Sequence, residues 1–228
     1  MLAGWSSDGY RTFEKPNGEG RFVLYAEQLQ PLPCDLPLVI GDTFQYLRHS
    51  LDHIVFALSR KNPAMTAQDE DIPSFPIYDG AVRDGAKAIS FLDQTARDDV
   101  RGLAPDPARQ ALDQDPLWLL NKMSNRDKHR EIVISPIARS DADTLILYES
   151  DGTDYFRGFG AKQLQPGAGP VALLELARSP GVKAEIGHSV KVIFDQGVEV
   201  ADRQVVATLR WFHEHIRDTV FQRLEAHL

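Results

Sequence analysis

Two short stretches of the sequence carry side chains of the types that bind anions or transfer protons. They are LRHSLDH, residues 47–53, and NKMSNRDKHR, residues 121–130. Each interrupts a helical pattern at a point where the apolar face should continue. Polar groups on the inner face of a helix must find partners or line a cavity. We therefore expect Arg48 or Asp52 to lie within hydrogen-bond reach of a residue in 121–130.

The spacing within the first stretch places its polar side chains on two flanks of one helix. Arg48 and Asp52 are four residues apart and share one flank, and His49 and His53 share another. At 3.6 residues per turn, Arg48 and His53 are separated by about 140° around the helix axis. These two side chains can meet at one site only if the helix is distorted or a second subunit contributes.

One interpretation is a structural network between the two stretches. We expect Arg48 to pair with Asp127, and Asp52 to pair with Lys128 or His129, because buried charges usually occur in pairs. Such a network would fix the register of the two helices. The residues assigned to it, beside Arg48, are His49, Asp52, Asn121, Asn125, Asp127, Lys128 and His129.

A second interpretation is catalytic. The pattern Arg48-His49, three residues, then His53 resembles the arginine–polar–spacer–histidine motif of the HEPN superfamily of helical domains. That resemblance implies a dimeric, metal-independent ribonuclease. Arg48 would hold the phosphate, and His53 would act as the acid–base residue on a ribose 2′-hydroxyl. No cofactor is expected. The strand-rich half after residue 130 is not part of the HEPN bundle.

A longer resemblance covers about residues 38–134. A group of bacterial proteins of unknown activity shares an LRxxLDH helix and, about 70 residues later, a helix that ends in DKHR. This resemblance implies no activity. It does imply that certain polar residues belong together, namely Arg48, Asp52, His53, Asn125, Asp127, Lys128 and His129.

A third interpretation is a metal site. His49 and His53 have the i, i+4 spacing that lets two imidazoles share one ion, with His129 or Asp127 as a third ligand. The sequence contains no HExxH motif, and the principal prediction is that no metal is bound.

The overall charge bears on RNA as a partner. The net charge of −8 gives the protein no general attraction to nucleic acid, so RNA binding requires a local basic patch. Such a patch exists in residues 121–130, where Lys122, Arg126, Lys128 and Arg130 stand against Asp127, a local charge of +3. RNA therefore stays a candidate partner.

Other sequence features concern location and assembly. No apolar run approaches the length of about 18 residues that a membrane span needs, so no membrane partner is expected. The first ten residues lack the pattern of a signal peptide, and Cys34 is the only cysteine, so we expect a cytoplasmic location. Trp211 and Phe221 lie beside the apolar stripe of the last helix. They would pack within the chain or against a second subunit of a homodimer.

The expected fold is one α+β domain over residues 1–228. It combines a helical layer of three to four main helices with a small antiparallel β-sheet. The helical part covers about residues 35–130, the strand-rich part about 131–195, and the C-terminal helix about 202–226. The expected helices are about 37–60, 84–101, 116–129 and 202–226. The expected strands are 21–27, 131–137, 144–149, 171–177 and 189–194, after a loose lead-in over residues 1–20.

Two functions remain open from the sequence. One is a metal-independent, HEPN-like ribonuclease that uses Arg48 and His53. The other is a non-catalytic binding or interaction module whose network of arginine, aspartate and histidine is structural. Exposure distinguishes them, because a catalytic site must leave Arg48 and His53 open to a cleft.

Overall fold

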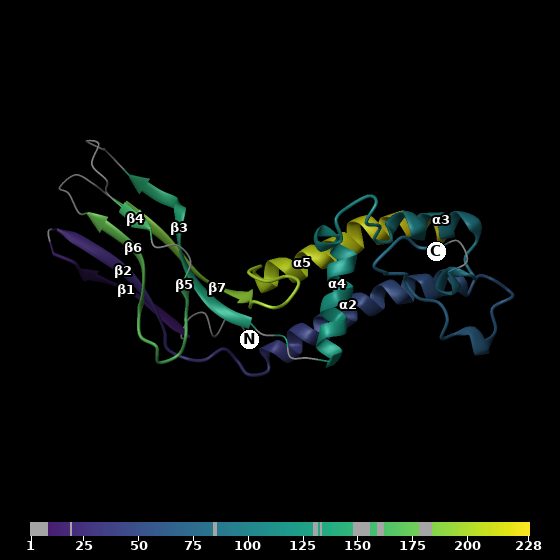
Figure 1. The fold of residues 1–228 in the computed structure, drawn as a ribbon, viewed down its shortest axis with the longest axis horizontal. Helices are drawn as coiled ribbons and strands as arrows, with labels where there is room; N and C mark the ends of the chain where they lie inside the picture. Colours follow the sequence, from purple (N-terminus) through teal and green to yellow (C-terminus); the bar gives the residue numbers. More distant parts are fainter. Residues whose placement is uncertain are drawn as a thin grey trace. The chain divides into compact units, whose positions relative to one another are not determined.

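The computed structural model shows the α+β fold expected from the sequence (Figure 1). It describes residues 9–18, 20–83, 86–129, 132, 134–147, 156–158, 162–177 and 184–228. The chain divides into two compact units. A strand unit contains residues 1–36 and 133–195, and a helical unit contains residues 37–132 and 196–228. Whether the two units form the single domain expected from the sequence stays a prediction.

The strand unit contains two antiparallel sheets in its described part. The strands of the first sheet lie in the order β1 (Tyr10–Pro16), β2 (Arg21–Gln28), β6 (Val171–Ala177) and β4 (Phe156–Gly158). Those of the second lie in the order β5 (Lys162–Gln163), β3 (Ile134–Leu147) and β7 (Ala184–Phe194). The apolar core of the unit gathers Leu24, Ala26, Leu164, Leu173, Leu174 and Leu176.

Three of the expected strands correspond to β2, β6 and the second half of β7. The loose lead-in expected over residues 1–20 is wrong for Tyr10–Pro16, which forms β1 and pairs with β2. Phe13 lies opposite Tyr25, and the two rings stack with centroids 5.7 Å apart. Cross-strand pairs of this kind stabilise a strand whose own pattern is weak. Residues 1–8 lie outside the described part.

The strands expected at 131–137 and 144–149 are parts of one longer strand. β3 covers residues 134–137 of the first and 144–147 of the second, and it pairs with β7 with a shift in register between Asp141 and Ile146. The polar residues in this interval resemble a turn in the sequence, yet pairing with β7 keeps the chain extended on both sides of the irregularity. Residues 131, 133, 148 and 149 lie outside the described part.

The helical unit is built from α2 (Leu36–Ser59), α3 (Gln94–Leu103), α4 (Pro116–His129) and a C-terminal helix. The C-terminal helix consists of α5 (Val205–His215), a π-helical turn η4 (Ile216–Phe221) and α6 (Gln222–Leu224). Short 3-10 turns are η1 (Ala67–Asp69), η2 (Lys87–Ile89), η3 (Leu112–Gln114) and η5 (Glu225–His227). Phe44 of α2 and Phe212 of α5, both buried, meet edge to face with ring centroids 5.9 Å apart.

Helix ends explain where the expected boundaries differ. The helix expected from residue 84 begins only at Gln94, because the Asp93 carboxylate accepts the N–H of Ala96 at 2.8 Å and caps it there. The C-terminal helix begins at Val205 rather than 202, since Asp202 has a positive φ of 62° that a helix cannot contain. Residues 84 and 85 are not described.

The π-helical turn keeps the buried side of the C-terminal helix in line. Phe212, Ile216, Val220 and Leu224 are buried and recur every four residues. On a regular α-helix, a four-residue step drifts by about 40° around the axis. A turn of wider, π-helical geometry reduces that drift, so all four side chains face the same core.

Within the helical unit, Asp99 of α3 contacts two side chains near the C-terminal end of the chain. Arg223 donates from Nε to one carboxylate oxygen of Asp99 at 2.8 Å, and Nε2 of His227 lies 2.8 Å from the other. The hydrogen bonds from His227 and then Arg223 lower the pKa of the Asp99 carboxyl.

In the described part of the chain, none of the helices combines the length and the apolar character needed to cross a membrane.

The hydrogen bonds of Asp99 with Arg223 and His227 predict a pH dependence of stability. Because folding lowers the pKa of Asp99, its contribution is complete above the unfolded-state pKa of about 3.9 and is lost as pH falls through the lower folded-state pKa. In Asp99→Asn, urea melts between pH 2 and 6 should therefore show a smaller loss of unfolding free energy on acidification. If the unfolding free energy of Asp99→Asn depended on pH as it does in the unchanged protein, this stabilising role of Asp99 would be contradicted.

Candidate functional site

Polar residues line the contact between α2 and α4. On α2 they recur every three or four residues, and on α4 every three, so each set occupies one face of its helix. We call this contact the polar seam. It is formed by Gly41, Gln45, Arg48 and Asp52 of α2 and by Asn121, Ser124 and Asp127 of α4.

Arg48 makes three hydrogen bonds in the polar seam. Its guanidinium donates from Nε to Oδ1 of Asn121 at 3.1 Å, from Nη1 to Oδ1 of Asp52 at 2.5 Å, and from Nη2 to the carbonyl oxygen of Phe75 at 2.9 Å. The Arg48 side chain is only 14% exposed. All three nitrogens of the guanidinium are therefore engaged by acceptors of its own chain.

Arg48 and Asp52 together hold an extended segment against the helices. Asp52 accepts the N–H of Phe75 at 2.9 Å, while Arg48 binds the carbonyl oxygen of the same residue. Phe75 is buried, with 1% of its surface exposed. A buried backbone segment outside a helix or sheet needs partners for its N–H and C=O groups, and this ion pair supplies both.

The other end of the polar seam is closed by Gln45 and Gly41. Gln45 donates to the carbonyl oxygen of Ser124 at 2.6 Å and to Asp127 at 3.3 Å, and it accepts the hydroxyl of the buried Ser124 at 3.0 Å. Gly41 faces Asp127 so closely that a Cβ on residue 41 would overlap the carboxylate. Only glycine leaves room for this arrangement.

The structure confirms contact between the two stretches but changes the partners. The expected pair of Arg48 with Asp127 is wrong, because Arg48 binds Asn121 and Asp52, while Asp127 lies beside Gln45. Asn121 and Asp127 are separated by about 9 Å along an ideal helix, so one guanidinium cannot serve both. Asp52 bonds Arg48 and Phe75 rather than Lys128, which is exposed.

The remaining candidate residues either lie away from the polar seam or have side chains that the structure does not describe. His49, His53 and Asn125 are exposed, and nothing is described of the His129 side chain. In the described part of the chain, no three His, Cys, Asp or Glu side chains group closely enough to hold a metal ion. The alternative metal site of His49, His53 and His129 thus stays a prediction.

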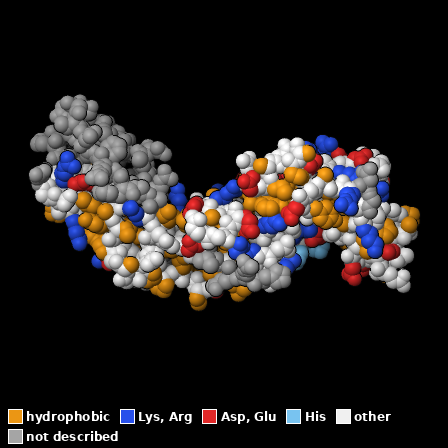
Figure 2. Space-filling model, in the orientation of Figure 1, with side chains coloured by type: hydrophobic (Ala, Val, Ile, Leu, Met, Phe, Trp, Pro, Cys, Tyr) orange, Lys and Arg blue, Asp and Glu red, His pale blue; other side chains and the backbone are white. Residues whose placement is uncertain are grey.

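The basic patch expected for RNA is partly neutralised within the chain. Lys122 pairs with Asp79 at 3.0 Å, and Arg126 pairs with Glu199 at 3.3 Å. Lys128 is exposed, and the fourth cation lies outside the described residues. On the face drawn in Figure 2, basic and acidic side chains of the helical unit are interspersed rather than gathered by sign. This distribution disfavours RNA binding there.

Sequence reasoning missed two members of the site. Gln45 lies three residues before Arg48 on the same helix face, so its spacing could have identified it. Phe75 contributes only backbone atoms, which carry no signature in the side-chain sequence.

Loss of Arg48 should destabilise the fold measurably. Arg48→Ala would leave Asp52, Asn121 and the Phe75 carbonyl without their shared donor. We expect a loss of about 1.5–3 kcal/mol in unfolding free energy, as for hydrogen bonds to charged groups. Arg48→Lys should recover only part, because an ammonium lacks the planar fork. His49→Ala, an exposed change on the same helix, is the control. Equal urea midpoints for Arg48→Ala and the control would contradict this prediction.

Gly41→Ala tests the close approach of Asp127. The added methyl group must displace Asp127 from Gln45, so we expect a loss of about 1–3 kcal/mol in chemical denaturation. Gly102→Ala is the matched control, because a Cβ there meets nothing within 4 Å and alanine favours the helix. In an Asp127→Ala background, Gly41→Ala should cost less. A Gly41→Ala protein as stable as the Gly102→Ala protein would refute the packing argument.

Comparison with known proteins gives no relative from which a role could be transferred. No family model, no curated protein and no solved structure matches the chain. The resemblances to the HEPN superfamily and to the LRxxLDH group thus stay predictions.

Proposed function

We propose that the chain is a non-catalytic binding or interaction module in which the network around Arg48 is structural. The observation that carries this proposal is the engagement of the Arg48 guanidinium by Asn121, Asp52 and Phe75. An arginine that clamps a substrate phosphate needs free donors directed at the ligand. Three of the five N–H groups of Arg48 are used within the chain, and turning the guanidinium toward a ligand would release α4 and the segment at Phe75, which would cost stability.

The helix geometry also supports the structural role. α2 is a continuous α-helix from Leu36 to Ser59, so Arg48 and His53 stay about 140° apart around its axis. A joint site would then require a second subunit. The exposure of His49 and His53 is the observation that favours the ribonuclease as a second candidate, because an acid–base residue must reach its substrate.

Assembly and location belong to the same proposal. Phe221 is 41% exposed and supports a homodimer contact, whereas Trp211 packs on Phe212 with ring centroids 5.0 Å apart and lies under Arg203. Gel filtration of Phe221→Ser against the unchanged chain addresses this contact. Cys34, the only cysteine, is exposed and free, which suits a reducing cytoplasm.

An RNA-cleavage assay tests the proposal. The purified chain should leave a mixed RNA pool intact, with or without EDTA, because no described site joins a free arginine to His53. His53→Ala and the control His213→Ala, which changes another exposed histidine, should behave identically. Cleavage that persists in EDTA and disappears only in His53→Ala, with an unchanged melting temperature, would establish the ribonuclease instead. Cleavage abolished by EDTA would favour a metal site.

A further inference from the structure

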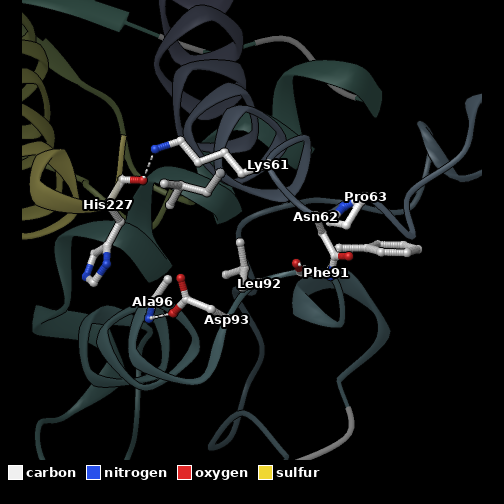
Figure 3. A pocket seen from close by; sticks show the side chains of 9 residues that line it. Lys61, Asn62, Pro63, Phe91, Leu92, Asp93, Ala96 and His227 are labelled. Atoms are coloured by element: carbon white, nitrogen blue, oxygen red, sulfur yellow. Dashed lines mark hydrogen bonds between the residues drawn. The ribbon is translucent and has the colours of Figure 1, made fainter.

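A hollow with a volume of about 340 Å³ opens at the end of α2, far along that helix from the polar seam. It is bounded by the last residues of α2, the turn that precedes α3, the first turn of α3, and His227 near the C-terminus (Figure 3). Its polar side chains are Lys61, Asn62, Asp93 and His227. The volume lies at the lower end of the range of small-molecule sites, about 300–1,000 Å³.

Two opposite charges border this hollow. Lys61 donates to the carbonyl oxygen of His227 at 2.6 Å, which leaves two of its three N–H groups for a ligand. One carboxylate oxygen of Asp93 caps α3 by accepting the N–H of Ala96. The other has no hydrogen bond within the described part of the chain. In Figure 3, Lys61 and Asp93 lie on opposite sides of the hollow.

The other two polar side chains, Asn62 and His227, make hydrogen bonds to residues around the hollow. Both polar atoms of the Asn62 amide form hydrogen bonds. Its nitrogen donates to the carbonyl oxygen of Phe91 at 3.0 Å, and its oxygen accepts the N–H of Ala64 at 3.0 Å. The His227 imidazole bonds Asp99 through Nε2, and because a carboxylate only accepts, this nitrogen carries the proton. Asn62 and His227 therefore hold the walls in place, and charge recognition falls to Lys61 and Asp93.

The charges and the apolar walls define one class of ligand. A simple anion would be attracted by Lys61 but repelled by Asp93, and a simple cation would be attracted by Asp93 but repelled by Lys61. A compound with both a carboxylate and an ammonium satisfies both residues. The apolar residues Leu58, Pro63 and Leu92 also line the hollow. We propose that this hollow binds a free α-amino acid with an apolar side chain, its carboxylate on Lys61 and its ammonium on Asp93. This inference rests on the proposed binding function.

The same contacts predict that the ligand stabilises the C-terminal end. Lys61 holds the carbonyl oxygen of His227, so a bound carboxylate would order the lysine that already fixes this residue. Any ligand that binds only the folded protein raises the melting temperature by mass action. The expected signal is therefore a saturable, concentration-dependent rise.

Calorimetry and thermal shift on the full chain test the proposal with leucine, methionine and phenylalanine. We expect saturable binding of at least one of them. Its analogues that lack the ammonium or the carboxylate, for leucine 4-methylpentanoate and 3-methylbutylamine, should bind at least tenfold more weakly. Glycine, which lacks the apolar side chain, should also bind more weakly.

Two variants assign the binding to this hollow. Lys61→Met removes the charge and keeps the stem, and Asp93→Asn removes the charge while asparagine still caps α3. Each should weaken binding at least tenfold, whereas Lys87→Met, a change at an exposed lysine outside the hollow, should not. Circular dichroism verifies folding of each variant, and the charge-deficient ligands test the proposal on the unchanged protein.

Three outcomes would overturn this inference. They are the absence of saturable binding by all three amino acids, equal affinity for the singly charged analogues, and affinities unchanged by both Lys61→Met and Asp93→Asn. None of these outcomes would restore catalysis by Arg48 and His53. Conversely, RNA cleavage would refute the proposed function without changing the amino-acid measurement, so the two failures are distinguishable.

Discussion

The helical unit depends on the hydrogen bonding of one guanidinium group. Arg48 joins α2 to α4 through Asn121, which is 73 residues away, and to the extended segment through Phe75, which is 27 residues away. A charge that is largely removed from water is tolerated only when it is paired and hydrogen-bonded. Three elements must therefore keep one arrangement for Arg48 to be satisfied, and Asp52 completes that arrangement by binding both Arg48 and Phe75.

The rest of the polar seam follows from the same constraint. The buried Ser124 would cost free energy without a partner, and Gln45 satisfies both its hydroxyl and its carbonyl oxygen. Gly41 permits the approach of Asp127 at the adjoining turn. Polar groups that look available for chemistry in the sequence are thus engaged in hydrogen bonds between the helices. The exposed polar groups near these helices include His49 and His53 of α2, Asn125 and Lys128 of α4, and Lys61 just after α2.

Much of the helical unit was predictable because its signals are local. Asp115 and Pro116 begin α4 as expected, with the Asp115 carboxylate accepting the N–H groups of Leu117 and Trp118. The strand unit was less predictable. β1 depends on partners in β2, and β3 continues through a polar interval because β7 pairs with both of its ends. Pairing between distant segments decides such strands, and a single strand's sequence does not contain it.

By itself, the sequence determined the α+β class, the extents of α2 and α4, and the contact between their polar stretches. Periodicity, capping and the need to satisfy buried polar groups are properties of residue types and their spacing. Only the tertiary structure decided that Arg48 takes Asn121 and the backbone of Phe75 rather than Asp127. The helix crossing selects which turns of α2 and α4 meet, and the backbone acceptor at Phe75 is common to every residue. Neither property can be read from side-chain identities.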